Sequence, residues 1–253
     1  MVGTDGSEAA QDAVTVAGMV ATRLLAPLTV VTTWKESSLR AGHDGDWALE
    51  TTLQAAARLA AENVTAVDRL ELPGAAAPML LDVAGQQPDT VLVLGARGLG
   101  RSKARWTGST ANTVSHHLTS DALFVHKVPK RWTTVGLATD GSPSSLRAVR
   151  RGYDLAITLG ARPFLVTAAK TEADGAATLL TVQGTADVED PEYFGTDVLT
   201  GVPAAEALCN AAWKYDLLVI GNRGMSGPAR LLGSVANKVT HDIDTNLLLV
   251  DTA

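Results

Sequence analysis

Two segments of this sequence share one glycine pattern: Gly-x-x-Gly, a spacer of eight or nine residues, and then Gly-Ser. The first copy spans residues 95–109 with a nine-residue spacer, and the second spans residues 221–234 with a spacer of eight. Upstream of each copy lies the tripeptide Asp-Gly-Ser, which begins at Asp5 and again at Asp140. Since a chain of 253 residues has room for two domains of about 125 residues, the repeat indicates two copies of one domain.

Strand-like and helix-like segments alternate along the first half. Short apolar runs rich in β-branched residues are typical of buried strands, and the Ala-rich stretches between them are typical of helices. The predicted strands are residues 1–4, 28–34, 64–72, 91–94 and 122–125. The predicted helices are residues 7–25, 48–63, 78–85 and 109–119. Strict alternation of this kind predicts an α/β doubly wound fold.

The second half repeats this order except in one weak stretch. Ser142 before Pro143 marks a helix start, because proline is favoured at the first helical position. Residues 171–195 hold three glycines and an acidic cluster, so they predict only a short helix at 176–183 followed by an exposed loop. The other predicted elements are strands at 135–139, 164–167, 217–220 and 247–250 and a helix at 234–242.

These elements predict two tandem doubly wound α/β domains, each with helices on both faces of a parallel sheet. We place the domains at residues 1–128 and 133–253, with a linker at 129–132. The second domain is expected to be shortened around residues 171–195, where the long second helix of the first half has no clear counterpart.

Charge and cysteine content narrow the classes of partner and compartment. The net charge of −6 and the pI near 5.3 argue against a general nucleic-acid binder, which would present a basic face. The single cysteine excludes an intramolecular disulfide, as is typical of proteins in a reducing compartment. No signal peptide or membrane-length apolar run is visible, so we expect a cytoplasmic protein without a membrane partner.

The glycine segments have the composition of a phosphate-holding loop. Glycine has no Cβ, so the backbone can approach an anion closely, and a helix that begins at Gly-Ser offers free N–H groups and a positive dipole end. Arg97 and Arg223 add positive charge within the two loops. The pattern differs from the dinucleotide-binding fingerprint and from a Walker A loop, which need other glycine spacings or a Gly-Lys-Ser/Thr end. A plain strand-to-helix turn is the competing interpretation of each loop taken alone.

Asp5 and Asp140 follow the first predicted strand of each half. In an open α/β sheet, that edge lines the ligand crevice beside the fourth strand. A carboxylate there can contact a base, a ribose or a metal. Asp-Gly-Ser is also good turn and helix-cap chemistry, so the sequence leaves both roles open, and they are compatible.

The chain resembles a tandem universal stress protein of the ATP-binding type, whose motif is Gly-x2-Gly-x9-Gly-Ser/Thr after an initial strand that ends in Asp. The first half matches the motif at Asp5, Gly95, Gly98, Gly108 and Ser109. The second half matches it at Asp140, Gly221, Gly224, Gly233 and Ser234, with a spacer one residue shorter than the motif. The resemblance covers nearly the whole chain apart from about residues 171–195.

The resemblance implies a five-stranded parallel sheet in each half, in the order 3-2-1-4-5, with the halves paired through their last strands. It implies that adenine rests near the end of the second strand, which maps to Thr33 and Ala168. It also implies that the backbone after Gly-Ser, at Thr110 and Val235, completes the phosphate cradle.

The function predicted from this resemblance is a stress-response regulatory protein that binds ATP, or AMP or ADP, with Mg²⁺ accompanying ATP and at most slow hydrolysis. Self-association of tandem chains is also expected, and the protein partner is not identified. One alternative is an interaction scaffold of the same fold with one or both sites empty. The other is a PP-loop ATP pyrophosphatase, which this sequence disfavours because it has Thr-Asp-Gly-Ser where that class carries Ser-Gly-Gly-x-Asp-Ser.

Overall fold

The computed structural model describes residues 1–35, 44–96, 110–222 and 232–252. Contacts along the chain divide it into two compact units, the first formed mainly by residues 1–128 and the second mainly by residues 129–253. The pairing of the halves through their last strands stays a prediction.

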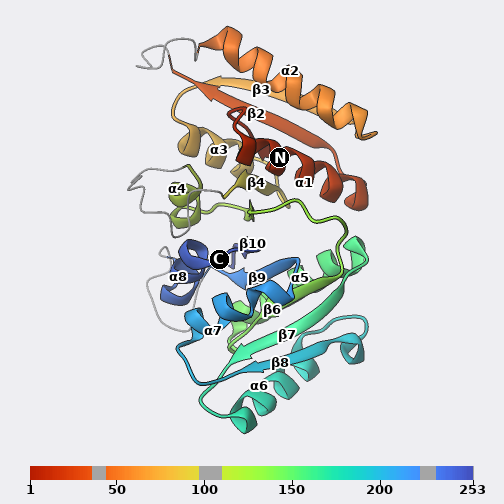
Figure 1. The fold of residues 1–253 in the computed structure, drawn as a ribbon, viewed down its shortest axis with the longest axis vertical. Coiled ribbons are helices and arrows are strands. Elements are labelled where there is room, and N and C mark those ends of the chain that lie inside the picture. The colour runs from red at the N-terminus through yellow and green to blue at the C-terminus, as the bar shows by residue number, and fades with distance from the viewer. Residues whose placement is uncertain (36–43, 97–109, 223–231, 253) are drawn as a thin grey trace. The chain divides into compact units, whose positions relative to one another are not determined.

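The described part of the first unit holds a five-stranded parallel sheet in the order β3-β2-β1-β4-β5, which is the predicted 3-2-1-4-5 arrangement. The chain runs in strict alternation from strand to helix (Figure 1). Its elements are β1 (Val2–Gly3), α1 (Glu8–Leu24), β2 (Leu28–Trp34), α2 (Gly45–Ala61), β3 (Val67–Pro73), α3 (Ala76–Gly85), β4 (Val91–Gly95), α4 (Thr110–His116) and β5 (Asp121–Val125).

The second unit repeats this topology, with parallel strands in the order β8-β7-β6-β9-β10. Two short 3-10 turns, η1 (Pro191–Tyr193) and η2 (Ala212–Lys214), precede β8 and β9. Its other elements are β6 (Thr134–Ala138), α5 (Pro143–Leu159), β7 (Arg162–Ala168), α6 (Glu172–Thr185), β8 (Gly195–Leu199), α7 (Ala204–Ala211), β9 (Leu217–Gly221), α8 (Ser234–Asp242) and β10 (Asn246–Val250).

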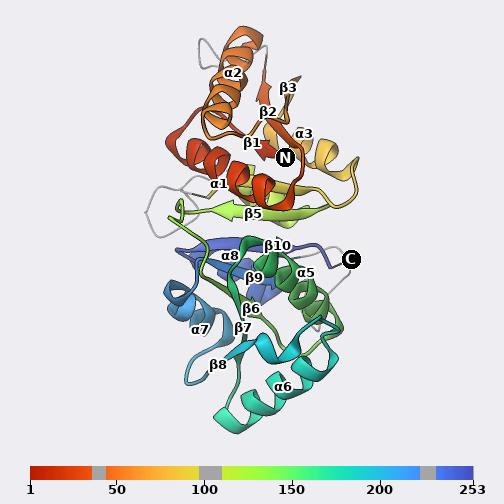
Figure 2. The same cartoon turned by 90° about the vertical axis from the view of Figure 1, so that its right-hand side faces the viewer.

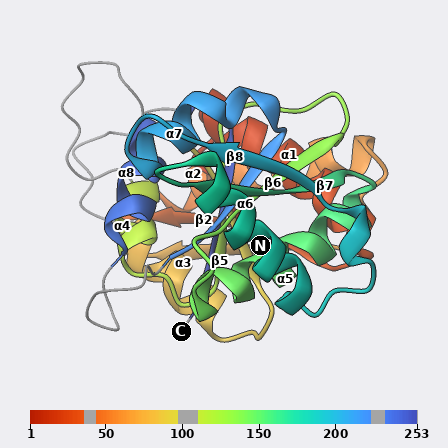
Figure 3. The same cartoon turned by 90° about the horizontal axis from the view of Figure 1, so that it is seen from below.

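Helices cover both faces of the second-unit sheet, as right-handed crossovers in opposite directions from the central strand require. Helices α5 and α7 lie on opposite sides of β6 and β7 (Figure 2). Seen from below, α8 lies beside α7 on that second face (Figure 3), and the two helices are in contact. The carboxyl ends of β6 and β9 therefore lie at the point where the strand order reverses, and α8 is the next described helix after β9.

The central strands are buried on both faces, which explains their continuous apolar sequences. Every residue of β9 is buried, including Leu217 and Leu218 at 0% exposure. The central strand of the first unit, β1, is only two residues long, whereas β6 has five. The first strand, predicted at residues 1–4, is present as β1 and pairs with both β2 and β4 through Val2.

Residues 171–195 are more regular than the sequence suggested. The predicted short helix at 176–183 is instead the 14-residue helix α6, followed by η1 and β8 rather than by a loop alone. The Thr171 hydroxyl caps this helix by accepting from Asp174 N–H at 3.1 Å and donates to the Asp174 carboxylate at 2.8 Å. This N-cap offsets part of the cost of the two glycines inside the helix, and packing on β7 and β8 fixes the helix in place.

Candidate functional site

The turn after β6 is fixed by two hydrogen bonds between neighbouring side chains and the backbone. The Gly141 N–H donates to the Thr139 hydroxyl at 3.2 Å, and the Ser142 N–H donates to the Asp140 carboxylate at 3.0 Å. The Ser142 hydroxyl then caps α5 by accepting from the Ser145 N–H at 3.2 Å. One oxygen of Asp140 therefore shapes the turn while its exposed carboxylate stays at the sheet edge.

The first unit forms the same turn with the same distances. The Gly6 N–H donates to the Thr4 hydroxyl at 3.2 Å, and the Ser7 N–H donates to the Asp5 carboxylate at 3.0 Å. Ser7 also caps α1. The turn-forming role that the sequence left open for Asp5 is therefore present in the structure, as it is for Asp140.

A cavity of about 240 Å³ opens at the carboxyl ends of β6, β7 and β9, beside α7 and α8. We call it the second-unit cavity. Five of the residues predicted for the second half line it: Asp140, Ala168, Gly221, Ser234 and Val235. Segments nearly 100 residues apart along the chain are thus brought together at the point where an open α/β sheet binds its ligand.

The N-terminus of α8 supplies donors to this cavity. Its N-cap is Gly233, which makes no side-chain capping bond, and its first three residues, Ser234, Val235 and Ala236, all line the cavity. The nearby start of α5, by contrast, is capped by the Ser142 hydroxyl. Because the first N–H groups of a helix have no partner within it, the N-terminus of α8 can hold an anion at this place.

Several lining residues were not predicted as site residues from the sequence. They are Thr139, Ser145, Ala204, Leu208, Ile220 and Ala236. Thr139 is the one with a usable signal, because the first half has a threonine at the same place before Asp-Gly-Ser. Its hydroxyl lies 2.9 Å from that of Ser145, and both side chains are buried in the cavity wall. Ala204 and Leu208 line the cavity because α7 packs beside it, and this position of α7 depends on tertiary packing.

The predicted first-unit residues lie at the corresponding places of the first sheet. Asp5 follows β1, Thr33 is half-buried near the end of β2, and Thr110 begins α4. Gly95 ends β4, where a Cβ would come within 2.5 Å of the Ala9 carbonyl oxygen. The missing side chain at this position thus makes room for α1. Six predicted site residues lie outside the described part of the chain: Arg97, Gly98, Gly108, Ser109, Arg223 and Gly224.

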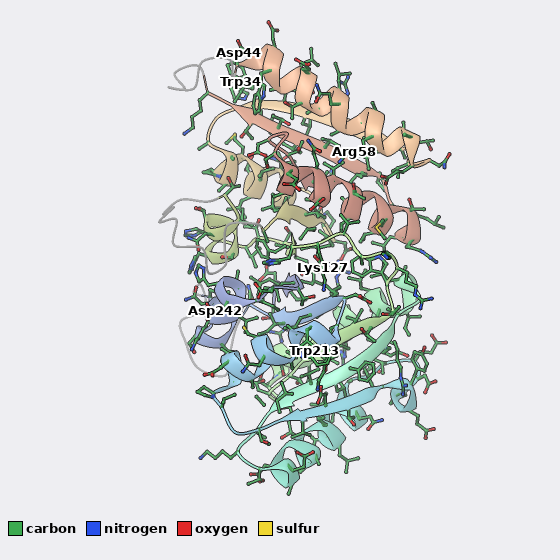
Figure 4. All side chains as sticks on the ribbon, viewed as in Figure 1. Trp34, Asp44, Arg58, Lys127, Trp213 and Asp242 are labelled. Carbon is green, nitrogen blue, oxygen red and sulfur yellow. The ribbon has the colours of Figure 1, made fainter. Side chains whose placement is uncertain are left out.

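A separate cavity, also of about 240 Å³, lies between α1 and α2 of the first unit. It is lined by residues such as Gly6, Gln11 and Arg58, and by none of Thr33, Gly95 and Thr110. Arg58 extends from α2 on this side of the unit (Figure 4), and its side chain is exposed. Of its lining residues, Thr4 is the one whose second-half equivalent, Thr139, lines the second-unit cavity.

None of the helices in residues 1–35, 44–96, 110–222 and 232–252 is long and apolar enough to cross a membrane. In the same ranges, no three or more His, Cys, Asp and Glu side chains form a group that could hold a metal ion.

Comparisons with known proteins agree with this architecture. The universal stress protein Rv1636 of Mycobacterium tuberculosis (strain ATCC 25618 / H37Rv) is 35% identical over 146 residues, which cover 48% of this chain and 97% of that protein. A universal stress protein from Archaeoglobus fulgidus DSM 4304 matches 100% of this chain and 98% of its own at 16% identity, with a TM-score of 0.74. A universal stress protein solved in complex with cAMP is 36% identical, covering 49% of this chain and 100% of that chain, with a TM-score of 0.42.

The sequence profile of the universal stress protein family matches the chain twice, at residues 1–126 and 131–251. These two matches span both units and leave only a few residues unassigned. The chain therefore belongs to the universal stress protein family, as a tandem of two of its domains.

Proposed function

We propose that the second-unit cavity binds an adenine nucleotide, ATP in the first instance, and that the protein acts as a nucleotide-dependent regulator in a stress response. The observation that carries the proposal is the convergence of Asp140, Ala168 and the uncapped start of α8 on one cavity at the strand-order switch. These three features match the parts of a nucleotide, namely ribose, base and phosphate.

The base would rest against the end of β7. The Thr139 N–H donates to the Val166 carbonyl at 2.9 Å, so the polar backbone groups of Val166 point toward β6. Ala168, two residues further, points its N–H and carbonyl to the same side, past the last residue of β6. Those groups can pair with the edge of an adenine ring, while the apolar side chains of Val166 and Leu208 cover its faces.

The phosphates would lie at the start of α8, whose N–H groups and dipole favour negative charge. Asp140 is the one titratable side chain among the described residues that line the cavity. It would contact the ribose hydroxyls or, when ATP brings Mg²⁺, the metal. No second acid or base faces it in this lining, so we expect hydrolysis to be slow. In the first unit, Asp5, Thr33 and Thr110 would serve the same parts of a second nucleotide.

The test compares two substitutions at one residue. Ser234→Pro removes the N–H at the first position of α8, where proline is tolerated, and the extended Gly233 (ψ 147°) suits a following proline. Ser234→Ala removes only the hydroxyl. By titration calorimetry we expect ATP to bind roughly tenfold more weakly to Ser234→Pro, with a smaller loss for Ser234→Ala and unchanged adenosine binding.

Native mass spectrometry of the purified protein would show whether an adenine nucleotide is retained, and ATP, ADP, AMP and cAMP are then titrated in turn. If the wild type and Ser234→Pro bind ATP with equal affinity, the phosphates do not bind at the start of α8. Absence of any bound or added nucleotide would favour the interaction-scaffold alternative.

A further inference from the structure

Asn222 follows β9 immediately after Gly221 and is 8% exposed. Its side chain makes three hydrogen bonds to the segment after β10. The Asn222 Oδ1 accepts from the Thr252 N–H at 3.0 Å and from the Thr252 hydroxyl at 2.9 Å. The Asn222 Nδ2 donates to the Asp251 Oδ1 at 2.9 Å. Both polar atoms of the amide are thus used, and its orientation is fixed.

The backbone of Asn222 makes two more hydrogen bonds, one of which reaches the helix start. Its N–H donates to the Val250 carbonyl at 2.9 Å, and its carbonyl accepts from the Gly233 N–H at 2.9 Å. Gly233 is the N-cap of α8. Asn222 therefore joins the end of β9, the end of β10 and the start of α8 at one point.

Thr252 anchors this point to the rest of the unit. The side chain of Thr252 is fully buried, and its carbonyl accepts from the Arg147 guanidinium of α5. Because Thr252 is tied to α5 and to Asn222 at the same time, movement of Asn222 would break buried hydrogen bonds. The Gly233 N–H thus meets an acceptor that is held in a defined place.

In the described part of the first unit, the residue at the position of Asn222 has no amide side chain to make these bonds. Thr4 and Thr139 are equivalent residues, because the N–H of each donates to the second strand of its own sheet. Counting along the strand pairs from these two residues, Ala96 after β4 occupies the position of Asn222 after β9. Ala96 keeps the backbone bond, from its N–H to the Val125 carbonyl at 2.8 Å, but an alanine side chain makes no hydrogen bond. The two halves therefore differ at the residue that holds the helix start in the second unit.

We infer that Asn222 is a positioning residue that fixes the N-terminus of α8 against the ends of β9 and β10, and so makes the second unit the tighter nucleotide site. This inference rests on the proposed function. Asn222 would hold Gly233, and Gly233 would place the α8 N–H groups that bind the phosphates. The base and ribose would bind elsewhere in the cavity, so Asn222 would not affect their binding.

The experiment measures ATP and adenosine affinity of the full chain by calorimetry, for the wild type and for Asn222→Ala. We expect ATP to bind about tenfold more weakly to Asn222→Ala, and adenosine to bind within about twofold of the wild type. The matched control is Asn246→Ala. Asn246 is a fully buried asparagine at the amino end of β10, on the opposite edge of the same sheet, and its Nδ2 donates to the Asp216 carbonyl at 3.0 Å.

A rescue pair separates positioning from loss of folding. Asn222→Asp places a carboxylate against Asp251 and should weaken ATP binding at least as much as Asn222→Ala. In the double variant with Asp251→Asn, the new amide at position 251 can donate to the new carboxylate at position 222, which reverses the wild-type hydrogen bond. The ATP affinity of this double variant should return to within about threefold of the wild type. Equal loss of ATP and adenosine affinity, the same loss in Asn246→Ala, or no rescue would each overturn the inference.

A measurement without nucleotide separates this inference from the proposed function. Amide hydrogen exchange of the ligand-free protein should be at least tenfold faster at Gly233 and Asn237 in Asn222→Ala, and unchanged there in Asn246→Ala. Unchanged exchange at α8 in Asn222→Ala overturns the inference even if ATP binds. Faster exchange in a protein that binds no nucleotide supports the positioning of α8 and rejects the proposed function.

Discussion

Gly6 and Gly141 have the same left-handed backbone at the same point of each half, with φ of +75° and +78°. Space is not the constraint, because a Cβ would meet only Thr51 Cγ2 at 3.6 Å or Thr178 Cγ2 at 3.4 Å. The constraint is the backbone conformation, which costs an L-residue roughly 1–2 kcal/mol. The glycine of each Asp-Gly-Ser turn is therefore required by the turn itself, whatever the adjacent aspartate binds.

Replacing Gly141 by alanine should lower the free energy of unfolding by about 1–2 kcal/mol, measured by urea denaturation. The matched control is Gly184→Ala, near the end of α6. That glycine is helical with open space around it, so alanine there should stabilise the protein by up to about 1 kcal/mol. Two glycine-to-alanine changes of the same sign would contradict the assignment of strain to the turn.

Tyr215 is a second residue whose environment makes a measurable prediction. Its hydroxyl donates to Asp197 at 2.8 Å, the ring is 3% exposed, and Lys214 Nζ lies 2.6 Å from the same carboxylate oxygen. Burial, then the hydrogen bond to Asp197 and the charge of that carboxylate, raises the pKa of Tyr215 above its ordinary value near 10. The folded state therefore keeps the phenol proton at pH values where the unfolded chain has lost it.

This difference makes stability depend on pH above about 10 and not below it, since a proton is released on unfolding only in that range. The wild type should therefore lose unfolding free energy steadily from pH 10 upward, whereas Tyr215→Phe should lose less. Tyr215→Phe should start about 1–2 kcal/mol below the wild type at pH 8 because the hydrogen bond is gone. Parallel curves from pH 8 to 11 would show that Tyr215 ionises equally easily in both states.

At the scale of elements, α6 combines buried side chains, Leu179 and Val182, with a side-chain N-cap at Thr171. Thr171→Ala removes the acceptor of the Asp174 N–H and should lower the unfolding free energy by about 1 kcal/mol. Thr181→Ala is the control on the same helix, because that exposed hydroxyl only donates to the Ala177 carbonyl and alanine is the better helix former. A loss at Thr181 as large as at Thr171 would mean that the cap is unimportant.

The same helix shows where prediction from sequence stops. Strands such as β4 and β9 were predictable because four consecutive aliphatic residues followed by Gly leave few alternatives. The helix α6 was predicted too short because glycines and a weak apolar periodicity hide it, although Thr171 and Asp174 form a cap signal. In the site, Asp140 and Gly221 were marked by the repeat. Leu208 was not, because the position of α7 over the sheet depends on packing between distant segments.

At the scale of the whole molecule, the two units share a topology but differ around the predicted sites. The second has Asn222 directly after β9, while the first has Ala96 directly after β4. A Cβ on Gly95 would lie 2.5 Å from the Ala9 carbonyl oxygen of α1. The nearest atom to a Cβ on Gly221 would be Thr252 Cγ2, at 3.2 Å. One fold used twice therefore need not mean two equal nucleotide sites.

Amide hydrogen exchange on the full chain, with and without ATP, tests this inequality directly. A ligand held at 100 times its Kd stabilises the binding unit by about 2.7 kcal/mol, which slows exchange through unfolding of that unit roughly a hundredfold. We expect this protection in the second unit, strongest at the ends of β6 and β9 and at the start of α8, at ATP concentrations that leave the first unit unchanged. Higher ATP concentrations should then protect the ends of β1 and β4. Protection that begins in the first unit, or rises equally in both, would contradict the order of affinity, because the three side-chain hydrogen bonds of Asn222 have no counterpart at Ala96.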